Sequence, residues 1–289
     1  MLLRQGRRAR PSGPSPVSAQ LPLAQALALG LLHGPTELLP VSSSAHTTLI
    51  PLMGGWRYAE LDPELRKAFE VALHTGAGLA LALELRGDLL KETLQLDGRH
   101  ALVIALTLAP PALAGLALHG AIERRLGGPR SIAAGLIAGS LAMGVAELRH
   151  APGTRARSDA RALDGMVLGI AQAAALMPGV SRSGATLAAA RVRGFAPADS
   201  QELSWHAALP VILGASALTG VRLARRPPSK EARTALIAGA LASFLSTRAS
   251  TVPLRKGESR RSLLGFCVYR CLLALVVMRR LRSAHNRNG

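Results

Sequence analysis

The chain has 289 residues, of which 49% are apolar, 18% charged and only 3% aromatic, and its formal net charge is +18 at pH 7. Such a charge is typical of nucleic-acid-binding proteins, but these need polar basic faces and stacking aromatic side chains. Because the apolar residues form long blocks with arginines gathered between them, the composition favours a membrane protein and predicts no nucleic-acid partner. A soluble all-helical protein is the alternative.

Residues 1–20 are rich in arginine, proline and serine and lack the apolar core of a cleaved signal peptide. We expect a disordered basic arm that lies on anionic lipid headgroups. The remainder, residues 21–289, is expected to form a single integral membrane domain.

Apolar blocks follow one another along this domain, and the block 101–122 is long enough to cross a hydrocarbon layer about 30 Å thick. Several others are shorter or interrupted by glycine and proline, which membranes tolerate only where protein or a wet cavity satisfies the backbone. We therefore predict an all-α, polytopic membrane helix bundle. Arginines lie in nearly every connection, so the positive-inside rule does not decide the orientation. The other blocks are 69–85, 131–148, 163–180, 203–221, 234–247 and 262–278.

The chain also contains an internal repeat. With a shift of 139 residues, 29–33 aligns with 168–172 and 41–45 aligns with 180–184. After each copy comes a glutamate with a histidine four residues later, Glu70 and His74 in the first and Glu202 and His206 in the second. Three coincidences in one order indicate duplication, with halves of about 21–150 and 160–289. Repeat-built membrane proteins often place their site on short interrupted helices at the repeat interface.

The densest polar cluster in an apolar context is HGPTELLPVSSSAH, residues 33–46. Pro35 and Pro40 make a continuous helix improbable. Glu37 would be costly in hydrocarbon unless it faces water, a cation or a partner. Three serines, residues 42–44, follow a proline and are placed to cap a new helix whose N–H groups can bind an anion. His46 then falls in the first turn of that helix. A polar helix break with a structural Glu–His contact is the alternative.

The second cluster is PGVSRSGAT, residues 178–186. The guanidinium of Arg182 is a permanently charged fork suited to phosphate oxygens. Gly179 and Gly184 permit close backbone approach, and the nearby hydroxyls supply neutral donors. Arg182 also suits a structural ion pair with Glu37, and both roles are compatible. The combined set predicts phosphoryl transfer, with Arg182 stabilising oxyanion charge, a serine or water attacking, and Glu37 or His46 moving protons.

At these two motifs the chain resembles the undecaprenyl-diphosphatase family of membrane phosphatases, the bacitracin-resistance type. The first family motif reads roughly E/Q-G-x-T-E-F-L-P-V-S-S-x-G-H, against HGPTELLPVSSSAH here. The second, P-G-x-S-R-S-G-x-T, is complete from Pro178 to Thr186. The similarity extends to segments 69–83, 202–218 and 268–277, and so covers the chain from about residue 21 to 280.

The resemblance implies a bundle with two inverted repeats and re-entrant helices in the bacterial plasma membrane, its active site open to the outer face. It implies removal of the terminal phosphate of undecaprenyl diphosphate, which recycles the lipid carrier for cell-wall synthesis. A divalent cation, Mg²⁺ or Ca²⁺, is the implied cofactor. Partners are the polyprenyl diphosphate and membrane lipids, and a homodimer is compatible. A transporter or flippase that binds the same headgroup without cleaving it is the rival interpretation.

Carried over by motif position, the catalytic residues are Glu37, Ser43, His46 and Arg182. Ser43 is the expected nucleophile, with His46 assisting proton transfer and water as the alternative nucleophile. Glu37, and secondarily His33, are the expected metal ligands. Diphosphate binding falls to Ser42, Ser44, Ser181, Ser183, Gly184 and Thr186.

Two positions depart from the family pattern. His33 stands in place of the acidic or amide residue, where an imidazole can still bind a metal or the diphosphate, or simply fill the core. Ala45 replaces a glycine, which narrows the backbone angles available there. The repeated glutamate–histidine pairs are candidates for an outer layer around the site.

Overall fold

The computed structural model describes residues 21–94, 97–149, 153–256 and 262–288, and within these ranges the chain is helical. The predicted basic arm, residues 1–20, lies outside the described residues. The only strand-like pairing in the described ranges is a single bridge between Arg155 and Phe195. The helices are α1 (Leu23–Leu38), α2 (Ser43–Gly54), α3 (Pro63–Leu94), α4 (Gly98–Leu126), α5 (Pro129–Arg149), α6 (Ala162–Ala174), α7 (Arg182–Val192), α8 (Pro197–Arg225), α9 (Lys230–Lys256) and α10 (Leu264–Asn288), with short 3-10 helices η1 (Arg57–Glu60) and η2 (Arg157–Asp159).

Five of the described helices, α3, α4, α5, α8 and α9, are long and apolar enough to cross a membrane. Large apolar side chains such as Leu116 of α4 (81% exposed) and Leu141 of α5 (64% exposed) lie on the outside of the bundle. Exposed apolar surface of this kind marks a membrane interaction site. The prediction of an all-α, polytopic membrane bundle is therefore confirmed.

The helices that carry the two motifs are much shorter. Helix α1 has 16 residues, α2 has 12, α6 has 13 and α7 has 11. At about 1.5 Å per residue none reaches the roughly 30 Å of a hydrocarbon core. The apolar block 163–180 thus ends as a helix at Ala174 instead of spanning. In each half of the chain two short helices precede three long ones, the order that a duplication requires. That the halves are inverted and the short helices re-entrant stays a prediction.

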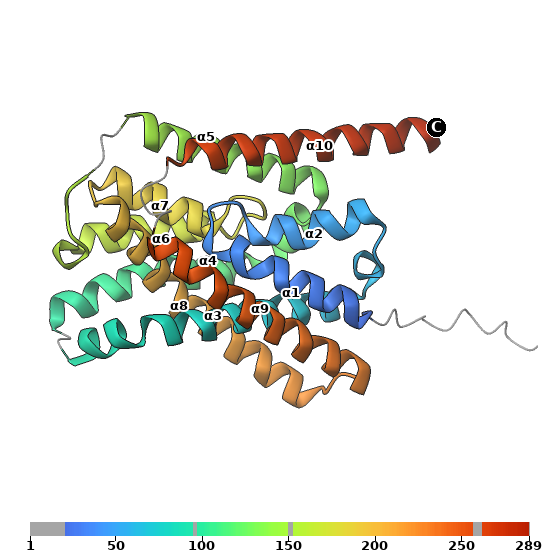
Figure 1. Ribbon diagram of the computed structural model, residues 1–289, viewed down its shortest axis with the longest axis horizontal. Helices are drawn as coiled ribbons and strands as arrows, with labels where there is room; N and C mark the ends of the chain where they lie inside the picture. The colour runs from blue at the N-terminus through green and yellow to red at the C-terminus, as the bar shows by residue number, and fades with distance from the viewer. Residues whose placement is uncertain (1–20, 95–96, 150–152, 257–261, 289) are drawn as a thin grey trace, which may run out of the picture.

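Close helix packing places α1 and α3 against α9, and α10 lies along α5 at the edge of the bundle (Figure 1). Small residues permit the approach. A Cβ atom added to Gly30 of α1 would lie 2.5 Å from the backbone oxygen of Gly239 in α9. Membrane helices commonly associate through such small residues because lipid offers little hydrophobic drive for helix pairing.

The expected break in the first motif is present, but Pro35 takes no part in it. Pro35 does not interrupt the first motif, since α1 continues through it to Leu38. A proline inside a helix removes its own N–H bond and crowds the carbonyl four residues earlier, but the surrounding bundle supports the remaining backbone. The break lies instead at residues 39–42, around Pro40.

Candidate active site

Two equivalent turns place the central side chains. Ser42 and Ser181 are the N-caps of α2 and α7, and their hydroxyls accept the N–H groups of Ala45 and Gly184. Their φ angles are 75° and 72°, the only positive values among described non-glycine residues. Such conformations are uncommon and cluster at functional sites. Ala45 avoids this region, so the loss of the family glycine there costs no backbone strain.

The first residue of each capped helix faces the same carboxylate. Ser43 begins α2 and donates its hydroxyl to Glu37 Oε2 at 2.6 Å. Arg182 begins α7 and donates from Nη2 to Glu37 Oε1 at 2.9 Å. Glu37 itself is buried in the last turn of α1. The structure therefore brings together, in one contact group, the predicted carboxylate, serine and arginine from the two motifs.

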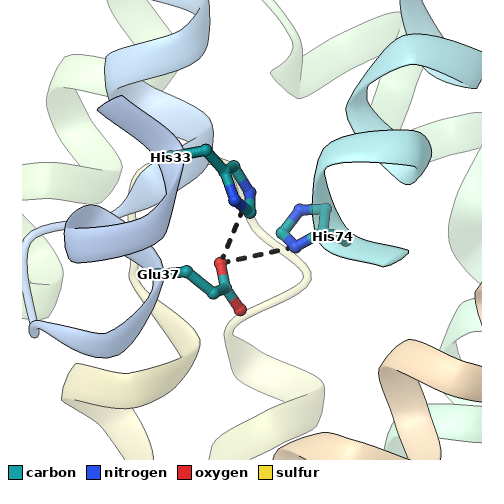
Figure 2. A group of neighbouring side chains, drawn as sticks. All are labelled: His33, Glu37 and His74. Atoms are coloured by element: carbon teal, nitrogen blue, oxygen red, sulfur yellow. Dashed lines mark ion pairs between the residues drawn. The ribbon is translucent and has the colours of Figure 1, made fainter. Parts of the chain in front are cut away.

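Two histidines complete the surroundings of Glu37. His33 lies one turn earlier on α1, with its Nε2 atom 3.8 Å from Glu37 Oε2. His74, on α3, places its Nδ1 atom 3.4 Å from the same oxygen. Figure 2 shows the three side chains pointing toward one another from the two helices. Their donor atoms all lie within 4.8 Å of each other, a group that can hold a metal ion.

His46 lies in the first turn of α2, as the sequence predicts, but both its ring nitrogens are engaged away from Ser43. Its Nδ1 atom lies 2.8 Å from the backbone oxygen of Ser42, and its Nε2 atom lies 2.6 Å from the Tyr269 hydroxyl. The Tyr269 ring also stacks on the imidazole. The role of His46 in proton transfer stays a prediction, and its available partner is Tyr269.

A buried arginine ties the two turns together. Arg270 of α10 is fully buried and donates to the backbone oxygen of Pro40 at 3.0 Å. It also donates to the backbone oxygens of Gly179 at 3.0 Å and Val180 at 2.9 Å. Because Pro40 precedes the α2 cap and Val180 precedes the α7 cap, one guanidinium fixes both turns.

Four of the remaining predicted binding residues are serines at the two helix caps. At the two caps, the hydroxyls of Ser42 and Ser44 are 3.2 Å apart, and those of Ser181 and Ser183 are also 3.2 Å apart. Of these four serines only Ser44 is exposed. We conclude that Ser44 is the member of this set already open to a ligand.

The predicted binding residues within α7, which are Ser183, Gly184 and Thr186, contact other protein atoms. Ser183 donates to the backbone oxygen of Leu39, which joins α7 to the first turn. Thr186 lies 2.7 Å from the Ser204 hydroxyl of α8. A Cβ atom at Gly184 would meet Met143 Sδ at 2.6 Å, so this glycine allows α7 to approach α5. Their proposed part in diphosphate binding stays a prediction.

The two repeated glutamate–histidine pairs do not behave alike. His74 reaches Glu37, whereas His206 contacts Arg157, which also pairs with Glu202. Glu70 accepts the hydroxyl of Tyr58 on η1. Only the histidine of the first pair therefore belongs to the candidate site.

Sequence reasoning missed Tyr269 and Arg270. Both lie in the apolar block 262–278, where Arg270 is a charged residue within a hydrophobic run. Charged residues in such runs are costly and usually functional, which is the signal that identifies it.

This geometry suits attack by an activated hydroxyl oxygen on the phosphorus atom of a negatively charged phosphate group. A hydroxyl that donates to a carboxylate can transfer its proton as it attacks. Arg182 supplies positive charge beside the same carboxylate, and the N-termini of α2 and α7 favour bound anions.

Comparison with known proteins identifies the family of the chain. Residues 26–276 match the family model described as bacitracin resistance protein BacA. The chain is 35% identical to an undecaprenyl-diphosphatase of Geobacter metallireducens over 266 residues, covering 88% of this chain and 96% of that protein. It is 34% identical to an undecaprenyl-diphosphatase of Gemmatimonas aurantiaca over 273 residues, covering 90% of this chain and 98% of that protein. The chain belongs to the bacitracin resistance protein BacA family.

Proposed function

We propose that this protein hydrolyses undecaprenyl diphosphate to undecaprenyl phosphate and phosphate, and so recycles the lipid carrier of cell-wall synthesis. Family membership and the names of its relatives support this activity. The observation that carries it is the Ser43 hydroxyl at 2.6 Å from a carboxylate whose other oxygen holds Arg182. A transporter needs to bind the headgroup, but it has no need of a hydroxyl poised against a base.

In the proposed reaction the diphosphate lies at the N-termini of α2 and α7, and Arg182 binds the oxygens of the terminal phosphate. Ser43 Oγ attacks that phosphorus while its proton passes to Glu37. The new O–P bond forms as the bond to the bridging oxygen breaks, and undecaprenyl phosphate leaves. Water then hydrolyses the phosphoserine, which releases phosphate and restores the hydroxyl. Direct attack by water is the alternative, in which Ser43 orients that water.

A divalent cation is part of the proposal, with Mg²⁺ or Ca²⁺ as the cations that the resemblance implies. Glu37 is the carboxylate that would hold it, and the separation of 3.8 Å from His33 Nε2 is short enough for one ion to contact both. When bound there, such an ion would neutralise charge on the phosphate oxygens. Ser43 and Arg182 remain beside it, each bonded to one oxygen of Glu37.

The cellular setting is also proposed. The bundle is a multi-pass membrane protein, and we propose, as the family resemblance implies, that it lies in the bacterial plasma membrane with its site open to the outer face. The chain is compatible with a homodimer as well as a monomer.

Phosphate release by purified protein in detergent tests the activity. Arg182→Ala should lower the rate with a long-chain polyprenyl diphosphate by several orders of magnitude, because charge on the transferred phosphoryl group loses its fixed cation. Thr234→Ala, an exposed change at the start of α9, is the matched control. If Arg182→Ala keeps the full rate, Arg182 has no part in the reaction. Transbilayer movement of the lipid in vesicles without phosphate release would instead identify a flippase.

A further inference from the structure

The nitrogen atoms around Glu37 have the spacing of a metal site. A zinc ion binds nitrogen and oxygen at about 2.0–2.2 Å in a tetrahedron, so two ligand atoms of one ion lie about 3.3–3.5 Å apart. Here Glu37 Oε2 lies 3.4 Å from His74 Nδ1 and 3.8 Å from His33 Nε2. The imidazoles meet edge to face, with an interplanar angle of 87°. The three donor atoms all lie within 4.8 Å of one another, so rotation of the two imidazole side chains brings them to the spacing of three ligands of one ion.

The tautomer of a neutral His33 ring is fixed by Ser243, on the side of the ring that faces away from Glu37. The hydroxyl of Ser243 donates to the backbone oxygen of Leu73, so its single hydrogen is used. Ser243 must then accept a hydrogen from His33 Nδ1, 3.1 Å away. The neutral ring consequently presents the lone pair of Nε2 to the Glu37 carboxylate. A nitrogen lone pair facing a carboxylate oxygen is repulsive unless a cation lies between them.

Both inward-facing nitrogens lack a hydrogen-bond partner. His33 Nε2 and His74 Nδ1 are buried and make no hydrogen bond, and the polar atom that each faces is the Glu37 carboxylate oxygen Oε2, at 3.8 Å and 3.4 Å. Buried polar atoms are normally satisfied, so two unsatisfied atoms facing one carboxylate point to a missing ligand. The His33–Ser243 bond is also the outer contact that commonly orients a metal-binding histidine.

The donor set decides the kind of cation. Mg²⁺ and Ca²⁺ prefer shells of oxygen ligands, whereas imidazole favours Zn²⁺ and other late first-row transition cations. We propose that His33, His74 and Glu37 form a three-ligand site for a Zn²⁺-type transition cation in this chain, in place of the Mg²⁺ or Ca²⁺ that the family resemblance implies. The side chain of His74 is 34% exposed, which leaves an approach for the ion and for a fourth ligand. Three protein ligands with one open position are typical of catalytic rather than structural zinc sites.

The proposed site lies beside the reacting groups. Glu37 Oε2, the oxygen that faces both histidines, also accepts the Ser43 hydroxyl, while Arg182 binds Oε1. The substrate phosphate would supply the fourth ligand. This participation in hydrolysis rests on the proposed function, but binding of the cation does not and is measured separately.

The test uses the full chain, purified in detergent without a histidine tag and stripped with a chelator. Co²⁺ is the spectroscopic probe, because tetrahedral Co²⁺ absorbs visible light much more strongly than hydrated octahedral Co²⁺. The affinity for Zn²⁺ follows from its displacement of Co²⁺. We expect one Co²⁺ per chain, displaced by Zn²⁺ and not by equal Mg²⁺ or Ca²⁺. His33→Ala and His74→Ala should each weaken binding at least 100-fold. Ser243→Ala should weaken it 10- to 100-fold, as loss of an outer contact does.

His100→Ala is the matched control, because His100 is an exposed histidine beside a carboxylate, Asp97, outside the site. It should bind Co²⁺ like the unaltered protein. If either alanine substitution fails to fold, His33→Glu replaces it in the test, because it keeps a ligand while exchanging nitrogen for oxygen. This variant should have a higher affinity for Mg²⁺ relative to Co²⁺ than the unaltered protein. Absence of Co²⁺ binding, or binding unchanged in both histidine variants, overturns the proposal. Phosphate release without Co²⁺ binding would leave the proposed function standing, whereas Co²⁺ binding without phosphate release would refute that function alone.

Discussion

Removal of the Arg270 side chain should disable the site without touching any group that meets the substrate. In Arg270→Ala the backbone oxygens of Pro40, Gly179 and Val180 lose their donor inside the bundle. A buried polar group left unpaired costs about 1–3 kcal/mol, so these three carbonyls together represent about 3–9 kcal/mol if the turns stay in place. The turns will instead move to find other partners.

That movement displaces the reacting residues. Pro40 lies three residues before Ser43, and Val180 lies two residues before Arg182. A misplacement of about 1 Å can cost about 100-fold in rate, so we expect phosphate release to fall at least that far. Arg270→Lys should recover only part of the rate, because one ammonium cannot match a planar fork that reaches both turns.

The assay measures phosphate release and thermal unfolding of the same detergent-purified samples. Arg280→Ala is the matched control, since Arg280 is an arginine of the same helix that also donates to a backbone oxygen, that of Met53, but at the exposed end. It should retain both rate and unfolding temperature. An Arg270→Ala protein with an unaltered rate would refute the argument that this guanidinium positions the two turns.

Three further predictions concern the base, the packing and a helix cap. Glu37→Gln should lower phosphate release by about 10²–10⁴-fold, because the amide holds its place but accepts the Ser43 proton poorly; a rate within tenfold of the unaltered protein would exclude Glu37 as the base. Gly139→Ala should lower the unfolding temperature, since the added Cβ would lie 2.5 Å from the backbone oxygen of Val180, whereas Gly144→Ala on the same helix meets open space and should not. Asp97 caps α4 through the backbone N–H of His100, a bond that lowers the pKa of this carboxyl below its usual value. Its stabilising effect is therefore present at neutral pH and lost as pH falls through that lowered pKa, so the unfolding temperatures of Asp97→Ala and unaltered protein should converge in acid; a difference independent of pH would contradict this.

The meeting of Glu37 with Arg182 could be predicted from the sequence because each motif interrupts an apolar run at the same place in a repeat. Helix caps at Ser42 and Ser181 follow from the same pattern, since serine after a proline or glycine break is a strong N-cap signal. The backbone conformation of these two serines could not be predicted. Positive φ angles are imposed by the tertiary contacts around the turns rather than by local preference.

Contacts between helices that are distant in the sequence also could not be predicted. Nothing local distinguishes His74 from its counterpart His206, and only the packing of α3 beside α1 brings the first one to Glu37. The bond between His46 and Tyr269 joins residues 223 positions apart, so no spacing rule reveals it. Pro35 illustrates the converse case, in which the bundle overrides a strong local signal and keeps α1 helical.

Ser43 and Arg182 each occupy the first position of a serine-capped helix, and this affects how a ligand is oriented. Two identical halves around a twofold axis would hold an unsymmetrical molecule equally well in either direction, and half of those complexes would present the wrong phosphorus. In this chain the first residue of the capped helix carries a hydroxyl in the first half and a guanidinium in the second. If the two halves are related as the predicted duplication implies, the difference between Ser43 and Arg182 gives the bound molecule one preferred direction.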